Sequence, residues 1–178
     1  MQKSTPMTAA PSKTEKAPGG DALWYAEALF FAYREFTGEP DRILNDIGFG
    51  RAHHRVLFFV SRYPALRVAD LLGILQITKQ SLSRVLRELI KKGYVRQEAG
   101  PNDRRERLLF VTDKGAGLVE RLAALQIARI EEGLRAAGVD GRDAVARFLD
   151  AMIGNTRYLP HNRVEQPIFD SDTPIEEK

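Results

Sequence analysis

The sequence predicts a mainly α-helical fold with a small β-hairpin, arranged as a winged helix-turn-helix lobe plus a helical dimerisation lobe. Apolar residues recur at helical spacing along most of the chain, and a turn-rich basic segment separates two short strand-like runs. A third observation is a helical pattern over 113–137, longer than a small domain usually covers by itself. With 178 residues, 43% of them hydrophobic, we expect one domain over 21–158. It comprises a lobe at about 55–112 and flanking helices at about 21–38 and 113–158.

The two ends of the chain have compositions with little to bury. Residues 1–20 are rich in Lys, Thr, Ser, Pro and Ala, and residues 159–178 are polar and acidic. We expect a disordered tail at the first end and a loose polar tail at the second. No apolar run approaches the roughly 20 residues that span a bilayer, and the first residues lack the apolar stretch of a signal peptide. We therefore expect a cytoplasmic protein without a membrane partner.

Two helices are expected before the helix-turn-helix. Asp21 can cap the first, and Gly38 and Pro40 are expected to end it. The second is expected from His53 to Arg62, where Pro64 stops it. The apolar positions of the first helix are Leu23, Trp24, Ala28, Phe31, Ala32 and Phe36.

The central pair of helices shows the most regular pattern in the sequence. A short helix is expected near 68–75, and a second begins at Thr78, whose hydroxyl can accept a backbone N–H at the open helix end. Gly93 suits the position just past the end of that helix. Its apolar stripe, expected in the core, is Leu82, Val85, Leu86, Leu89 and Ile90. The opposite side carries Gln80, Arg84 and Arg87, with Ser83 beside them.

A basic hairpin is expected directly after this helix. Residues 94–98 and 108–111 have strand-like composition, and the turn residues between them lead into Arg104 and Arg105. From Lys79 to Arg107 there are nine Lys and Arg residues against four Asp and Glu, a local excess of five positive charges. Because the net charge of the whole chain is only +3, its basic character belongs to this segment.

Two further helices are expected after the hairpin. Thr112 can cap the long one, which runs to about Ala137 and is broken at 138–141. Its apolar positions are Leu118, Val119, Leu122, Leu125, Ile127, Ile130 and Leu134. Those of the last helix are Val145, Phe148, Leu149, Met152 and Ile153.

This order of elements is typical of proteins that bind double-stranded DNA. In a helix-turn-helix the second helix, here 78–92, lies in the major groove, where glutamine can pair with adenine and arginine with guanine. A hairpin wing with arginine at its tip, here 94–112, suits a narrow minor groove of negative potential. The expected DNA contacts are Thr78, Lys79, Gln80, Ser81, Ser83, Arg84, Arg87, Asp103, Arg104, Arg105 and Arg107.

The segment Leu66 to Gly115 resembles the DNA-binding lobe of the MarR family of transcriptional regulators. Pro101-Asn102-Asp103-Arg104-Arg105 and Leu109-Phe110-Val111-Thr112-Asp113-Lys114-Gly115 carry the likeness. The family's wing has an Asp-x-Arg element, which Asp103 and Arg105 match. The resemblance implies that Arg105 contacts the minor groove and that the Asp103 carboxylate holds its guanidinium group.

The same resemblance implies a homodimer, in which the first and the last two helices of two subunits interleave. The stripe of the helix 113–137 would then be covered by the partner, with Leu122 in the seam. A two-fold protein should bind a palindromic site with half-sites roughly 34 to 36 Å apart. The resemblance favours a repressor and allows release by a small-molecule effector. Ligand candidates are Tyr33, Arg51, His54 and Phe58, although aromatic residues at helical spacing are also typical of a core.

Other functions are weighed by the residues that they would need. A winged-helix module that binds another protein stays open as the alternative. An enzyme is not expected, since the chain has no cysteine, no phosphate-binding glycine loop and no spaced metal ligands. His53 and His54 are adjacent and point about 100° apart on a helix, so they cannot jointly face one ion without help. We expect no cofactor and no metal.

Overall fold

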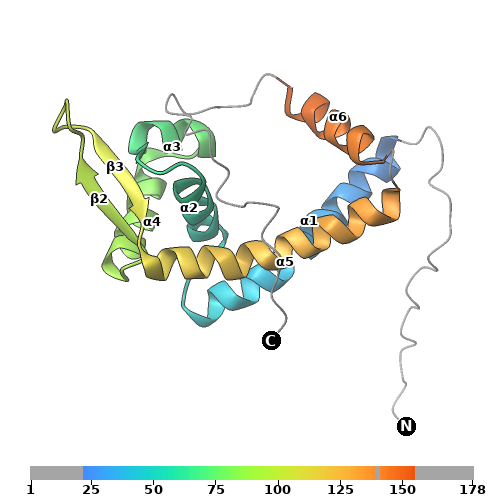
Figure 1. Ribbon diagram of the computed structural model, residues 1–178, viewed down its shortest axis with the longest axis horizontal. Helices are drawn as coiled ribbons and strands as arrows, with labels where there is room; N and C mark the ends of the chain where they lie inside the picture. Colours follow the sequence, from blue (N-terminus) through green and yellow to red (C-terminus); the bar gives the residue numbers. More distant parts are fainter. Residues whose placement is uncertain (1–21, 139–140, 155–178) are drawn as a thin grey trace, which may run out of the picture. The chain divides into compact units, whose positions relative to one another are not determined.

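The computed structural model describes residues 22–138 and 141–154, and the predicted cap Asp21 and both predicted tails lie outside these ranges. The prediction of a mainly helical fold with a small antiparallel sheet is confirmed (Figure 1). The elements follow the order α1 (Ala22–Asp46), α2 (Arg51–Arg62), β1 (Leu66–Arg67), α3 (Val68–Leu75), α4 (Lys79–Lys91), β2 (Val95–Ala99), β3 (Arg107–Val111), α5 (Asp113–Ala137) and α6 (Gly141–Ile153). Among the described residues, every helix is too short or too polar to span a lipid bilayer.

The chain divides into two compact units, Met1–Glu35 and Phe36–Lys178. The described residues of the first unit are the first turns of α1, where Leu23, Phe30 and Tyr33 are exposed. The second unit holds the remaining elements and the core. Within it we call the end of α1, α2, α3, α4, the sheet and the first turns of α5 the winged lobe.

Helix α1 continues past the residues expected to end it. It runs to Asp46 with Pro40 inside, so the prediction of an end at Gly38 and Pro40 is wrong. A proline inside a helix costs about 3 kcal/mol because one backbone hydrogen bond is lost and its ring crowds the preceding turn. Here the ring of Pro40 is fully buried, as is Leu44 one turn later. Packing of this turn against the core offsets the penalty.

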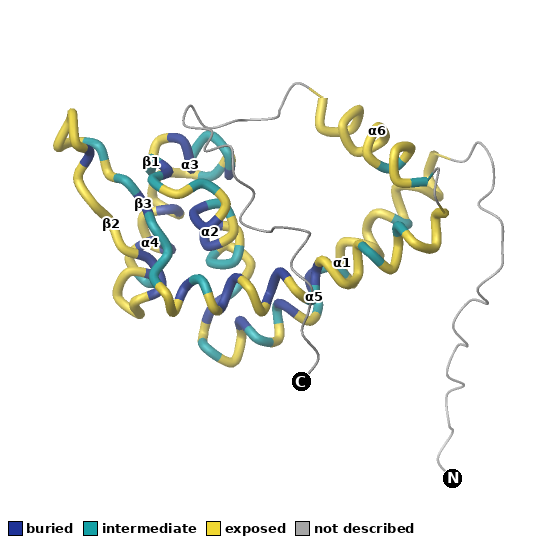
Figure 2. Tube along the Cα trace, viewed as in Figure 1, coloured by how far each residue is buried: buried dark blue, intermediate teal, exposed yellow. Residues whose placement is uncertain are grey.

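The core of the winged lobe is a single apolar cluster that helices and sheet share (Figure 2). Its fully buried leucines are Leu44, Leu57, Leu71, Leu82, Leu89, Leu109 and Leu122. Burying one such side chain contributes about 1.5 to 3 kcal/mol relative to leaving it in water. Leu44 and Leu122 lie outside the lobe of 55–112 that the sequence predicted. The core therefore also needs the end of α1 and the start of α5.

Helix α5 changes its surroundings along its length. Leu118, Val119 and Leu122 are buried in the core, whereas Ile127 and Ile130 are exposed. The prediction that Leu122 lies in a dimer seam is wrong, because the first turns of α5 pack against α2 and β3 of the same chain. The apolar stripe of α5 is therefore buried in its first turns and exposed in its later ones.

The wing belongs to a three-stranded antiparallel sheet in the order β1-β3-β2. Strand β3 pairs with β2 from Val95 opposite Val111 to Ala99 opposite Arg107. It also pairs with β1, where Leu66 lies opposite Leu109. Strand β1 was not predicted from the sequence, since two residues are too few for an alternating pattern. This strand joins the base of the wing to the start of α3.

Local capping chemistry sets the bounds of α4 as predicted. The Thr78 hydroxyl accepts the backbone N–H of Ser81 at 3.2 Å, and Gly93 adopts a left-handed φ of +74° just past the helix end. Four stripe residues are buried, but Ile90 is 38% exposed, so its expected place in the core is wrong. The C-terminal end of the stripe runs past the edge of the core.

Candidate nucleic-acid interface

The polar face of α4 is presented to solvent because its other face is buried. Leu82, Val85, Leu86 and Leu89 fix the rotation of the helix about its axis. The predicted contact residues on the opposite side are all exposed, namely Thr78, Lys79, Gln80, Ser81, Ser83, Arg84 and Arg87. Thr78 and Ser81 are joined at the helix start by a hydroxyl–hydroxyl hydrogen bond of 2.9 Å.

A side-chain hydrogen bond between His53 and Glu88, which was not predicted from the sequence, joins α2 to α4. His53 Nδ1 accepts the backbone N–H of Gly50 at 3.1 Å, so its Nε2 carries the proton and donates to Glu88 Oε2 at 2.8 Å. The His53 ring stacks on Phe49 with 4.5 Å between centroids, and Lys92 Nζ lies 4.5 Å from the centroid of Phe49. His53 is thus used to orient α4.

Residues 100–106, between β2 and β3, form the wing turn, and Asp103 holds it together through hydrogen bonds to backbone N–H groups. Its Oδ1 accepts the backbone N–H of Arg105 at 2.8 Å, and its carbonyl accepts the N–H of Glu106 at 3.0 Å. The Asp103 carboxylate was expected to hold the guanidinium of Arg105, whereas here it holds the backbone of that residue. An aspartate readily bonds the backbone two residues on, because its short side chain mimics a backbone turn.

The cations of the interface differ in whether they have partners in the protein. Within the described part of the chain, the guanidinium groups of Arg84, Arg87, Arg104 and Arg105 form no ion pair or hydrogen bond, and all four residues are exposed. By contrast, Arg96 forms an ion pair with Glu98, and its guanidinium carbon lies 4.2 Å from the centroid of the Phe110 ring.

Arg107 is also engaged, since it donates to the Arg104 carbonyl at 2.7 Å. Among the predicted contact residues, the unpaired guanidinium groups therefore lie on the polar face of α4 and in the wing turn. Each retains its full capacity to bond an external acceptor.

The predicted ligand residues lie on two elements. Arg51 Nε donates to Asp41 Oδ2 at 2.8 Å. Burial lowers the pKa of His54, and the negative charge of Asp41 opposes this shift. Phe58 lies on the same helix as Arg51 and His54 and packs edge-on against Phe59, while Tyr33 belongs to the first unit and is exposed.

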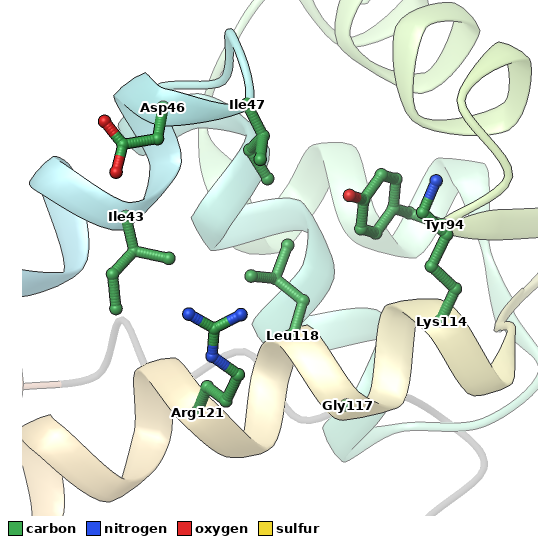
Figure 3. A pocket seen from close by; sticks show the side chains of 8 residues that line it. All are labelled: Ile43, Asp46, Ile47, Tyr94, Lys114, Gly117, Leu118 and Arg121. Carbon is green, nitrogen blue, oxygen red and sulfur yellow. The ribbon is translucent and has the colours of Figure 1, made fainter.

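A pocket of about 390 Å³ lies at a different place in the second unit (Figure 3). Its lining residues are Ile43, Asp46, Ile47, Tyr94, Lys114, Gly117, Leu118 and Arg121. Lys114 Nζ lies 4.3 Å from the centroid of the Tyr94 ring and donates a hydrogen bond to the Lys92 carbonyl at 2.9 Å. None of the four predicted ligand residues lines this pocket.

Comparisons with known proteins agree with this arrangement. A MarR family model matches residues 47–106. The HTH-type transcriptional regulator PetP of Rhodobacter capsulatus is 45% identical over 146 residues, which cover 77% of this chain and 88% of that protein. The chain's fold is similar to that of a MarR-family regulator from Silicibacter pomeroyi, with a TM-score of 0.64, 21% identity and coverage of 82% of this chain and 99% of the other.

A structure of FabT from Streptococcus pneumoniae in complex with DNA has a similar fold as well. Its TM-score is 0.66 at 16% identity, with coverage of 74% of this chain and 94% of that one.

Proposed function

This chain belongs to the MarR family of helix-turn-helix transcriptional regulators, and from that premise we propose that it binds a specific DNA sequence as a homodimer. The observation that carries the proposal is the set of exposed, unpaired guanidinium groups on α4 and in the wing turn of one lobe. Arginine without a partner in the protein is suited to phosphate oxygens and to guanine edges. The FabT structure of similar fold is a complex with DNA, which supports the same function.

The proposed contacts follow from the chemistry of each side chain. In the major groove, Gln80 pairs with adenine, and Arg84 or Arg87 with guanine. Arg105 enters the minor groove beside the half-site, where a narrow A·T stretch concentrates negative potential. The hydroxyl and ammonium groups of Thr78, Lys79, Ser81 and Ser83, together with Arg104, bind backbone phosphates. Asp103 and Arg107 shape the wing turn.

A homodimer would cover apolar side chains that are exposed in a single chain. These side chains lie on the C-terminal end of α5, on α6 and on the first turns of α1. A second copy that covers these faces would make a symmetric pair with two winged lobes. Such a pair should bind a palindromic site with half-sites roughly 34 to 36 Å apart.

Repression with effector release completes the proposal. A dimer on a site that overlaps a promoter would compete with the transcription machinery, which is the behaviour of a repressor. An effector would act by binding the DNA-free form more tightly. The pocket beside Tyr94 and the predicted ligand residues Arg51, His54 and Phe58 of α2 are two candidate positions for such a molecule within the second unit, and Tyr33 of the first unit stays a separate candidate.

The test measures binding to the duplex upstream of the protein's own gene and to a scrambled duplex at several salt concentrations. We expect a preference for the upstream duplex and an affinity that falls steeply with salt, as counterion release requires. Arg84→Ala and Arg105→Ala should each weaken specific binding by about 1 to 3 kcal/mol. Arg62→Ala makes the same charge change at an exposed position of α2, outside α4, the wing turn and the proposed dimer faces, and should alter binding little.

The alternative of a module that binds protein makes the opposite prediction. No preference between the two duplexes, with an activity that survives both substitutions in the interface, would overturn DNA recognition.

A further inference from the structure

One guanidinium group joins the wing to the helical part of the lobe. Arg67 ends β1 and precedes α3. Its Nε and Nη2 donate to the two carboxylate oxygens of Asp70 at 2.7 and 2.9 Å, while its Nη1 donates to Glu106 Oε1 at 3.3 Å. Asp70 belongs to α3, whereas Glu106 follows the wing turn. The side chain of Arg67 therefore joins α3 to a wing residue that lies 39 positions after Arg67 in the sequence.

The α3 side of this bridge is firmly held. The side chain of Asp70 is only 8% exposed, and it receives a two-pronged bond from the planar guanidinium. The backbone of Arg67 is held at the base of the wing, since Arg67 lies opposite Leu108 in the β1–β3 pairing. Its guanidinium therefore links Glu106, which lies nearer the wing tip, to the buried carboxylate of α3.

The Glu106 side of the bridge is part of the wing turn itself. The Glu106 carbonyl accepts the backbone N–H of Gly100 at 3.1 Å, and its N–H donates to the Asp103 carbonyl at 3.0 Å. The turn is tight, because a Cβ added at Gly100 would lie 2.8 Å from the Asp103 carbonyl oxygen. Glu106 directly follows Arg105. A displacement of Glu106 therefore displaces the unpaired arginines of the tip.

We propose that Arg67 and Glu106 are positioning residues that set the direction of the wing relative to α4, and thereby the reach of Arg105 into the minor groove. The inference rests on the proposed DNA-binding function. A strand of five residues is about 17 Å long, so a tilt of about 10° at the base moves the tip by about 3 Å. That displacement is as large as a hydrogen-bond length. A wing that is held in place also loses less conformational freedom when it binds.

Electrostatics and positioning predict opposite effects for one substitution, Glu106→Gln. It removes a negative charge beside the proposed DNA surface, so charge alone would strengthen binding. Positioning instead predicts about fivefold weaker binding to the upstream duplex, because the amide holds Arg67 less firmly. Glu98→Gln is the matched control, since Glu98 is another exposed wing carboxylate, paired with Arg96 and outside the bridge. It should bind as tightly as the parent protein, or more tightly.

A second variant keeps the charge of the bridge. Arg67→Lys leaves a cation that lacks the rigid fork needed to bond Asp70 and Glu106 together. It should also weaken binding several-fold. Thermal unfolding of each variant establishes whether the lobe stays folded, and Glu106→Gln should melt close to the parent protein, because Glu106 is 39% exposed and its pair contributes little to stability.

The deciding measurement is a double-mutant cycle with Arg105→Ala. If the bridge acts through the wing tip, Glu106→Gln should change affinity by less than about twofold once Arg105 is gone. The positioning role is overturned if Glu106→Gln binds as tightly as the parent protein or more tightly. It is also overturned if the full loss persists in the Arg105→Ala background. A parent protein without preference for the upstream duplex would instead overturn the proposed function itself.

Discussion

Helices α4 and α6 carry the same kind of apolar stripe and have opposite surroundings. In α4, Leu82 and Leu89 are at most 1% exposed, whereas in α6 Leu149 and Met152 are 47% and 57% exposed. Figure 2 shows α6 as largely exposed, and none of its residues is buried. Helical periodicity indicates that a face will be covered, but it does not indicate which surface covers it. The winged lobe covers α4 from within one chain, and we propose that a second copy covers α6.

The largest effect is expected from a charge in the part of α5 that belongs to the winged lobe. Leu122 is fully buried in the core. Leu122→Asp places an unpaired carboxylate there and should destabilise the fold by more than about 4 kcal/mol. Urea unfolding followed by circular dichroism measures this loss. A variant that stays folded and merely becomes monomeric would instead place Leu122 in a dimer seam.

The same kind of substitution on α6 should act on assembly alone. Leu149→Asp should leave the winged lobe folded but weaken the dimer by about 2 kcal/mol or more, roughly a thirtyfold rise in Kd. Analytical ultracentrifugation at several protein concentrations measures this shift. Ala151→Asp is the matched control, because at about 100° per residue it lies well away from the stripe. Equal dimer affinities for the two variants would contradict the proposed interface.

Two glycines of α5 test how closely the start of this helix is packed against the lobe. A Cβ at Gly115 would lie 2.1 Å from the Tyr94 carbonyl oxygen, whereas one at Gly117 would meet no atom within 4 Å. Gly115→Ala should therefore cost about 1 to 3 kcal/mol. Gly117→Ala should be neutral or stabilise by up to about 1 kcal/mol, since alanine favours helices. If both substitutions gave the same unfolding midpoint, the proposed close contact would be absent.

The smallest expected effect concerns ionisation on α2 in the winged lobe. Burial lowers the pKa of His54 below its ordinary value of 6.5, against the opposing charge of Asp41. Below pH 6.5 the unfolded chain then binds more protons at this residue than the folded chain does. The contribution of neutral His54 to the free energy of unfolding is therefore fully present above about pH 6.5. It is lost as the pH falls through the pKa of His54 in the folded protein. His54→Gln should flatten this decline in urea midpoints measured between pH 8 and pH 5. A pH profile identical to that of the parent protein would place His54 in water.

Much of the winged lobe could be predicted because its determinants are local. The caps at Thr78 and Thr112 and the stop at Gly93 each depend on residues within one helical turn, and all three are confirmed. Pro40 shows the limit of local rules, because burial against distant segments offsets an unfavourable helix residue. Strand β1 was missed for a similar reason, since it depends on β3, about 40 residues later along the chain.

In the candidate site, too, some features depend on nearby residues and could be predicted, whereas others depend on distant residues and could not. The polar face of α4 follows from the apolar stripe opposite it, so its exposure could be predicted from spacing alone. The pairs His53–Glu88 and Arg67–Glu106 join residues 35 and 39 positions apart, and no periodic pattern predicts them. Asp103 was expected to hold a guanidinium, and the geometry of a short turn brings its carboxylate to the backbone instead. The DNA contacts themselves stay predictions.

The most direct test of DNA binding by two copies of this chain is a hydroxyl-radical footprint on the duplex upstream of its gene, with the parent protein and Leu149→Asp side by side. The parent protein should protect two patches one helical turn apart, because two winged lobes are held by one dimer. Leu149→Asp should give weak protection of separate half-sites at much higher protein concentration. A single protected patch with the parent protein, or an unchanged footprint with the variant, would contradict the claim that two copies of this chain bind DNA together.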